Sequence, residues 1–152
     1  MTAWSARLAE LGLTLPPVAA PLAAYVPAVR SGAQVLTSGQ LPFVDGVLAA
    51  TGKVGAQVSA EQGKELARTC ALNALAAVHA LVGIDSVVRV VKVVGYVASA
   101  EGFTGQPGVV NGASELLGEV FGEAGVHARS AVGVAELPLG SPVEVELVVE
   151  VR

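Results

Sequence analysis

The spacing of apolar residues predicts two long helices. Apolar side chains recur at helical intervals from residue 59 to 82, and again from about residue 107 to Gly125, where a glycine can end the helix. Ser59 and Gln62 have the spacing of a capping box, in which each side chain bonds the backbone of the other residue. Pro107 suits the first turn of the second helix. We expect these two helices to form one layer of the fold.

Strands are predicted where short valine-rich runs lie between turn residues. Residues 29–39 predict a hairpin that turns at Ser31 and Gly32. Residues 87–97 predict a strand that is apolar on both faces, interrupted only by Arg89 and Lys92. A strand with two apolar faces is covered on both sides. We therefore expect the helices on one face of the sheet and a second covering on the other face.

The last part of the chain predicts two more strands, and these carry most of the candidate chemistry. Residues 130–135 and 143–151 are the predicted strands, and a turn bounded by prolines joins them. If the two strands pair, Arg129 lies near Glu144 or Glu146. An arginine beside carboxylates at the edge of an apolar sheet is a candidate small-anion site. It is equally a candidate structural ion pair.

The remaining segments complete a single domain. Residues 2–12 predict a short amphipathic helix, and four prolines impose an extended course on residues 13–27. The order is then hairpin, helix, strand, helix and two strands, which is typical of an α+β domain with a mixed sheet and its helices on one face. We expect one domain over residues 1–152, with residues 1–21 as an N-terminal arm.

The composition is apolar for a monomer. Hydrophobic residues make up 53% of the chain and charged residues 14%, and the mean hydropathy is +0.63. The only uncharged run long enough to span a membrane, residues 11–29, is broken by four prolines, and Glu10 with no basic region before it does not fit a signal peptide. We expect a cytoplasmic protein with no membrane partner that hides apolar surface by self-association.

Charge and cysteine content exclude several classes of function. Nine basic against thirteen acidic residues give a net charge of −4, and no basic stripe is visible, so no nucleic-acid partner is expected. One cysteine and two histidines are a poor set of ligands, so no metal site is expected. Cys70 lies among apolar helix positions and is interpreted as a core residue. The glycine-rich residues 101–108 lack the lysine of a phosphate-binding loop.

A family resemblance emerges from the order of several short motifs. ARSAVGVAELP over residues 128–138, followed by VEVE over residues 143–146, resembles the signature of the Rid family of reactive intermediate deaminases, also called YjgF-like. Ala24-Tyr25-Val26, LTSGQLP over residues 36–42, and Asn111 followed by Glu115 agree in the same order, from Leu22 to the C-terminus. The resemblance implies a chorismate-mutase-like fold and a homotrimer whose sheets face a central barrel, with clefts between subunits.

The resemblance also implies an activity. Active family members hydrolyse enamine and imine intermediates, such as 2-aminoacrylate, to 2-keto acids and ammonia without a cofactor. Carried onto this chain, Arg129 is the residue that binds the substrate carboxylate, since a planar guanidinium grips it with two parallel bonds. Glu144 is the residue that positions water. The implied substrate-binding positions are Tyr25, Ser38, Gly39, Asn111 and Ala131.

Departures from the family pattern predict a divergent branch. His127 stands where a small residue or proline is usual, and we interpret it as a loop histidine near the site. The N-terminal arm and the connection from Asn111 to Arg129 are longer than usual, and residues 46–58 and 102–108 are expanded. The alternative function is a trimeric small-carboxylate-binding or regulatory module without turnover. A third is the endoribonuclease label sometimes given to the family, which the acidic charge balance opposes.

Overall fold

The capping box begins the longest helix of the chain. In the computed structural model, which describes residues 3–20 and 24–152, the Ser59 hydroxyl accepts a hydrogen bond from the Gln62 amide, and the Gln62 side chain accepts one from the Ser59 amide. Helix α2 (Ala60–Val82) follows and ends at Gly83, which has a φ of 81°. The predicted start and end are confirmed. Met1, Thr2 and Pro21 of the predicted arm, and Leu22, lie outside the described residues.

The second long helix ends earlier than predicted. Helix α3 (Gln106–Phe121) carries its proline in the first turn, as expected. It ends at Gly122, whose φ of 57° breaks the helical course, and a short 3-10 turn, η2 (Gly122–Gly125), follows. The two long helices pack closely because Gly112 has no side chain: a β-carbon there would overlap the Lys64 carbonyl of α2. The glycine therefore sets the distance between the helices.

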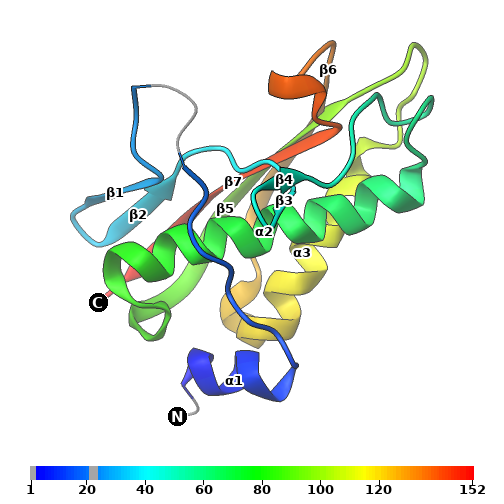
Figure 1. The fold of residues 1–152 in the computed structure, drawn as a ribbon. Coiled ribbons are helices and arrows are strands. Elements are labelled where there is room, and N and C mark those ends of the chain that lie inside the picture. Colours follow the sequence, from blue (N-terminus) through cyan, green and yellow to red (C-terminus); the bar gives the residue numbers. More distant parts are fainter. Residues whose placement is uncertain (1–2, 21–23) are drawn as a thin grey trace.

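The sheet has five strands in the order β1-β2-β7-β5-β6 (Figure 1). All neighbours are antiparallel except β5 and β6, so the sheet is mixed. The expectation that the last two strands pair with each other is wrong, because β5 lies between them. A helical crossover places consecutive strands in parallel, so α3 brings β6 beside β5, and β7 pairs with the other edge of β5. The strands are β1 (Ala28–Ser31), β2 (Gln34–Thr37), β5 (Val87–Ala98), β6 (Ala128–Val134) and β7 (Val143–Val151).

A small hairpin lies at the start of the expanded segment of residues 46–58. Strands β3 (Phe43–Val44) and β4 (Val47–Leu48) pair across Asp45 and Gly46, which both have positive φ. An Asp-Gly pair between strands is the usual signal for such a turn. The predicted hairpin at residues 29–39 is confirmed, although its turn lies one residue further along, at Gly32 and Ala33.

One face of the sheet is covered and the other is open. Helices α2 and α3 lie on the same face, as expected (Figure 1), and inward residues such as Val93 and Leu147 are fully buried beneath them. On the opposite face, Val29, Leu36 and Val132 remain 38–51% exposed. The second covering that the sequence predicts for β5 therefore does not come from α2 or α3.

The N-terminal helix is tied to the helix layer. Helix α1 (Trp4–Glu10) places the Trp4 indole nitrogen 2.8 Å from the Val87 carbonyl, and the Trp4 ring meets Phe121 edge to face at 5.1 Å. The Ser5 amide and hydroxyl both donate to the Asp85 carboxylate, and these bonds lower its pKa. The chain then runs without helix or strand through residues 13–20. Among the described residues, no helix has the length and apolar content needed to span a membrane.

Candidate functional site

Arg129 is held by one face of helix α3. Its Nη1 donates to Asn111 Oδ1 at 2.7 Å and to Ser114 Oγ at 3.2 Å, and its Nη2 donates to the Pro107 carbonyl at 3.3 Å. The three partners lie four and three residues apart, a spacing that puts them on one side of a helix. The guanidinium therefore has a fixed position at the free edge of β6. We call Arg129, Asn111, Ser114 and His127 the arginine cluster.

The histidine before β6 belongs to the same network. His127 is half-buried, with Nδ1 2.6 Å from the Gly125 carbonyl and Nε2 2.9 Å from Ser114 Oγ. Its interpretation as a loop histidine near the site describes its place in the chain but misses this contact. Ser114 links the ring to the guanidinium, since its hydroxyl lies within hydrogen-bond distance of both.

Glu144 lies on β7, and its carboxylate occupies the space that a side chain at Gly39 would fill. A β-carbon at Gly39 would overlap Glu144 Oε1, so the glycine leaves the space that the carboxylate occupies. The neighbouring Ser38 hydroxyl donates to the Val26 carbonyl at 2.6 Å, which ties this turn to the segment after Tyr25. A small cavity is lined by Tyr25 and Gly39 among others. We call Glu144, Gly39, Ser38 and Tyr25 the glutamate cluster.

The surroundings of Glu144 favour its protonated form. Partial burial raises the pKa of Glu144, and the nearby Glu146 carboxylate raises it further. Glu146 itself accepts a hydrogen bond from the Tyr96 hydroxyl at 2.8 Å, and this bond is the main cause that raises the pKa of Tyr96 to about 12. The phenol therefore keeps its proton at neutral pH. Glu144 is the group of this cluster suited to accept a proton.

The two clusters lie on opposite faces of the sheet. Arg129 is paired in register with Val93, which is paired with Leu147, and cross-strand partners point to the same face. That face is the one beneath the helices. Glu144 is three residues from Leu147, so its side chain points to the open face, where it pairs with Tyr96. Within one chain, Arg129 does not lie near Glu144 or Glu146, and that expectation is wrong.

The structure thus divides the predicted site residues into two groups. Asn111 and Arg129 are in direct contact, and Ala131 lies two residues further along β6 on the same face, in register with Gly95. Tyr25, Ser38 and Gly39 gather instead around Glu144. The roles implied for these residues stay predictions.

Sequence reasoning missed Ser114 altogether. The signal was available, because Asn111 and Ser114 stand three residues apart on a predicted helix and so share a face. What the sequence did not provide was the strand against which this face packs. Without that neighbour, no partner could be assigned to Ser114.

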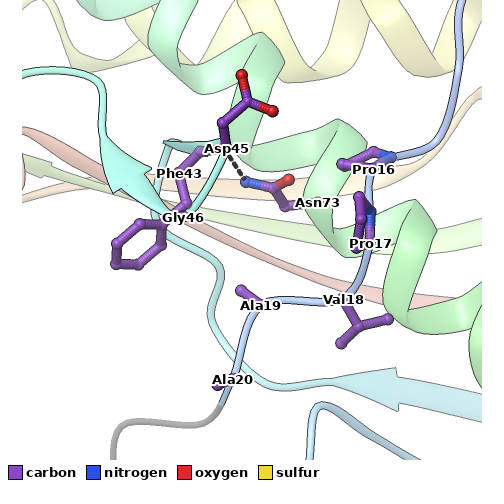
Figure 2. A pocket seen from close by; sticks show the side chains of 9 residues that line it. All are labelled: Pro16, Pro17, Val18, Ala19, Ala20, Phe43, Asp45, Gly46 and Asn73. Carbon is purple, nitrogen blue, oxygen red and sulfur yellow. Dashed lines mark hydrogen bonds between the residues drawn. The ribbon is translucent and has the colours of Figure 1, made fainter.

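A cavity of about 430 Å³ lies between the N-terminal arm and the β3–β4 hairpin. Figure 2 shows residues 16–20 on one side of it, and Phe43, Asp45 and Gly46 on another. Asn73 of α2 forms part of the wall, where its amide nitrogen donates to the Leu41 and Phe43 carbonyls. Ala19, Ala20 and Phe43 also line the small cavity at Tyr25 and Gly39. The arm therefore helps to shape the surroundings of the glutamate cluster.

Cys70 is fully buried, and burial raises the pKa of its thiol well above the ordinary value. Its interpretation as a core residue is confirmed. Across residues 3–20 and 24–152, no three side chains of histidine, cysteine, aspartate or glutamate come together in a way that could hold a metal ion.

Comparison with known proteins identifies close relatives over nearly the whole chain. "Protein TCP17" of Trypanosoma cruzi is 48% identical over 150 residues, which cover 97% of this chain and 94% of the relative. The crystal structure of Atu1372 from Agrobacterium tumefaciens, described as having unknown function, is 44% identical, with a TM-score of 0.90 and coverage of 98% and 92% of the two chains. A structure from Shewanella oneidensis described as "a putative endoribonuclease" is 34% identical, with a TM-score of 0.94 and coverage of 99% and 100%.

The Rid proteins themselves are more distant. The structure of RidA from the Antarctic bacterium Psychrobacter sp. PAMC 21119 is 27% identical, with a TM-score of 0.64 and coverage of 88% and 94%. The profile of the family described as "YjgF/chorismate_mutase-like, putative endoribonuclease" matches residues 5–151. The chain therefore has the chorismate-mutase-like fold and belongs to the Rid family, also called YjgF-like.

Proposed function

We propose that this chain is a cofactor-independent enamine and imine deaminase. Its substrates are small, reactive 2-imino acids of the 2-aminoacrylate type, and its products are 2-keto acids and ammonia. The enamine first moves a proton from nitrogen to carbon and becomes the imine. Water then adds through its oxygen to the imine carbon while the nitrogen gains a proton. Breaking of the C–N bond releases ammonia and leaves the carbonyl, so one water is consumed and no oxidant is needed.

The observation that carries this proposal is the state of the Arg129 guanidinium. Asn111, Ser114 and Pro107 accept three of its N–H bonds. Among the described residues, no acceptor is bound to its Nε–H or to the second hydrogen of Nη2. A carboxylate can take Nε–H together with an Nη2 hydrogen, because these two donors lie on one side of a guanidinium and match its two oxygens. Helix α3 thus orients the arginine and leaves two of its N–H donors for the substrate carboxylate.

Glu144 supplies the base in this proposal. Its raised pKa makes its carboxylate a better proton acceptor than an exposed glutamate. The role of Glu144 is to orient the attacking water and take its proton, and then to return a proton to the leaving nitrogen. No metal or cofactor is needed, because the imine carbon is already electrophilic.

A complete site requires more than one copy of the chain. Arg129 and Glu144 point to opposite faces of one sheet, so a substrate held by the first is not within reach of the second in the same chain. The open face, which carries Glu144, also carries exposed apolar residues. We propose a homotrimer in which the β6 edge of one subunit approaches the open face of the next, so that each cleft takes its arginine from one subunit and its glutamate from the other.

Two measurements test this function. Hydrolysis of 2-aminoacrylate, generated in the assay, is compared between wild type and Arg129→Ala, with Arg129→Lys to separate charge from fork geometry. Loss of activity in the alanine variant and a raised KM in the lysine variant support the proposal, whereas equal rates contradict it. A mass from light scattering that corresponds to a monomer contradicts the shared cleft.

The second candidate is a small-carboxylate-binding module without turnover. The cavity beneath the N-terminal arm and the identity of only 27% to RidA are the observations that favour it. Calorimetric binding of a 2-keto acid with no hydrolysis of any imino acid supports this candidate over the enzyme.

The endoribonuclease in the family's description is a third candidate. The net charge of −4 opposes it, because RNA binding depends on neutralising phosphates. Tight RNA binding that weakens steeply with salt would favour it.

A further inference from the structure

We infer that His127 and Ser114 are positioning residues that fix the orientation of Arg129 through a directional chain of hydrogen bonds. The inference rests on the proposed function only for its kinetic consequence. The chain itself runs from the Gly125 carbonyl through the His127 ring and the Ser114 hydroxyl to the guanidinium. Each step has a direction that the chemistry of its atoms determines.

The Gly125 carbonyl determines which atom donates in the first hydrogen bond of the chain. A carbonyl oxygen only accepts, so the 2.6 Å contact requires that His127 Nδ1 carries the hydrogen. In the neutral ring, Nε2 is then a bare acceptor. The Ser114 hydroxyl, 2.9 Å away, donates its only hydrogen to Nε2.

The direction ends at Arg129. Because the Ser114 hydrogen points to the histidine, the oxygen presents its lone pairs to Nη1, which donates to it at 3.2 Å. The other Nη1 hydrogen goes to Asn111 Oδ1. Among the described residues, Nη1 thus has two acceptors, Nη2 has one and Nε–H has none. The donors left for a ligand are Nε–H and the second hydrogen of Nη2. If the serine hydrogen pointed to Arg129 instead, donor would face donor and the guanidinium would rotate.

The other histidine of the chain, His79, is a matched control for the tautomer of His127. The chain has two histidines, and His79 makes the opposite contact: the Ile84 amide donates to His79 Nδ1 at 3.1 Å. In its neutral form His79 must therefore carry its hydrogen on Nε2. One molecule thus holds two histidines in opposite tautomers, for reasons that are visible in their hydrogen bonds.

The first test does not depend on any activity. Long-range ¹H–¹⁵N correlation spectra of the full chain, labelled with ¹⁵N-histidine, report which ring nitrogen carries the hydrogen, and a His79→Gln variant assigns the two rings. We expect His127 as the Nδ1–H tautomer and His79 as the Nε2–H tautomer. A His127 ring with its hydrogen on Nε2, or a doubly protonated ring at neutral pH, overturns the inference.

The second test separates positioning from folding. Ser114→Ala removes the link, and we expect KM for the imino acid to rise about tenfold, the size expected for one hydrogen bond to a charged group, while kcat changes less than about threefold. Ser114→Thr keeps the hydroxyl and is expected to restore KM to within about threefold of wild type. An unchanged KM in Ser114→Ala, or a threonine variant as poor as the alanine variant, contradicts the inference.

A pair of substitutions at His127 separates the contribution of Nε2 from that of Nδ1. In His127→Gln, the longer amide can reach the place of Nε2 and accept from Ser114, whereas the shorter amide of His127→Asn reaches only toward the Gly125 carbonyl. We expect the glutamine variant to keep a KM within about threefold of wild type and the asparagine variant to resemble Ser114→Ala. The reverse order overturns the inference.

The failures of the two proposals can be told apart. If wild type hydrolyses no imino acid, the proposed function fails, while the tautomers of His127 and His79 still test the chain of hydrogen bonds. Calorimetric binding of pyruvate to wild type, Ser114→Ala and Ser114→Thr then replaces KM as the readout. If Arg129→Ala abolishes hydrolysis but Ser114→Ala behaves as wild type, only the positioning inference fails.

Discussion

Arg129 and Glu144 project from opposite faces of one sheet, with β5 between the strands that carry them. The arginine is bound to helix α3 on the covered face. The glutamate lies on the open face against Gly39. A reaction that uses both side chains on one substrate therefore requires two copies of the chain.

Subunit complementation tests this requirement. Arg129→Ala and Glu144→Gln are each expected to lose nearly all activity as pure proteins. When equal amounts are unfolded together and refolded, a cleft is intact if its arginine comes from the glutamine variant and its glutamate from the alanine variant. Random assembly makes roughly a quarter of the clefts intact, so about a quarter of wild-type activity should return. The unmixed variants, refolded alone, are the control, and no gain on mixing would contradict the shared cleft.

Glu144→Gln should stabilise the protein at neutral pH. The pKa of Glu144 is raised above its ordinary value of 4.5 in the folded protein, so the folded state binds this proton more tightly than the unfolded chain does. That contribution is present below the unfolded pKa and is lost as the pH rises through the folded pKa. At pH 7 the ionised carboxylate therefore lowers the free energy of unfolding, and glutamine removes the charge.

Urea unfolding at pH 7 and pH 4, at one protein concentration, measures this effect. The variant is expected to have the higher midpoint at pH 7, and the difference should shrink at pH 4, where the wild-type carboxyl is largely protonated. A variant that is less stable than wild type at pH 7 would show that the ionised carboxylate is stabilising. In the same variant, the rate of imine hydrolysis should fall about 100-fold, the lower range for loss of a general base.

Gly39→Ala should act on activity through Glu144. The added β-carbon takes the place of the carboxylate end of Glu144, and this flexible end moves more readily than the backbone does. We expect a fall in kcat with a change in the free energy of unfolding below about 1 kcal/mol. A double-mutant cycle with Glu144→Gln is the control, because the glycine substitution should have little further effect once the carboxylate is gone. If the effects of the two substitutions on kcat are additive, Gly39→Ala does not act through Glu144.

Two glycines of the same helix should respond to alanine with opposite signs. In α3, a β-carbon at Gly112 overlaps the Lys64 carbonyl, whereas a β-carbon at Gly118 meets no atom within 4 Å. Gly112→Ala forces the two long helices apart and should destabilise the fold by about 1–3 kcal/mol. Gly118→Ala should stabilise it by about 0.5–1 kcal/mol through helix propensity. Thermal and urea unfolding measure both, and equal effects would contradict the close approach of α2 and α3.

The sequence predicted the elements whose signals are local. The capping box of Ser59 and Gln62 places the start of α2, and Gly83 places its end. In the same way, the valine-rich run predicted strand β5, and Pro107 predicted the first turn of α3. The β3–β4 hairpin was missed because each strand has only two residues, too few for a periodic pattern.

The candidate site shows the limit of such reasoning. Alternation along β7 separated Glu144 from the buried valines and leucine correctly, because side chains in a strand point to alternate faces. Alternation does not say which strand is the neighbour. The hairpin assumed for the last two strands therefore placed Arg129 beside Glu144, and it left Ser114 and His127 without a role.

The sequence by itself determined the family, the helices, the strands and the residue types that carry the chemistry, since caps, periodicity and motifs act over a few neighbouring residues. Only the tertiary structure decided that β6 lies in parallel beside β5, because this depends on how α3 packs across the sheet. That packing turns the arginine toward Asn111, Ser114 and His127, and it leaves the glutamate on the far face. The separation of the two side chains follows from the order of the strands, which no local pattern along the chain encodes.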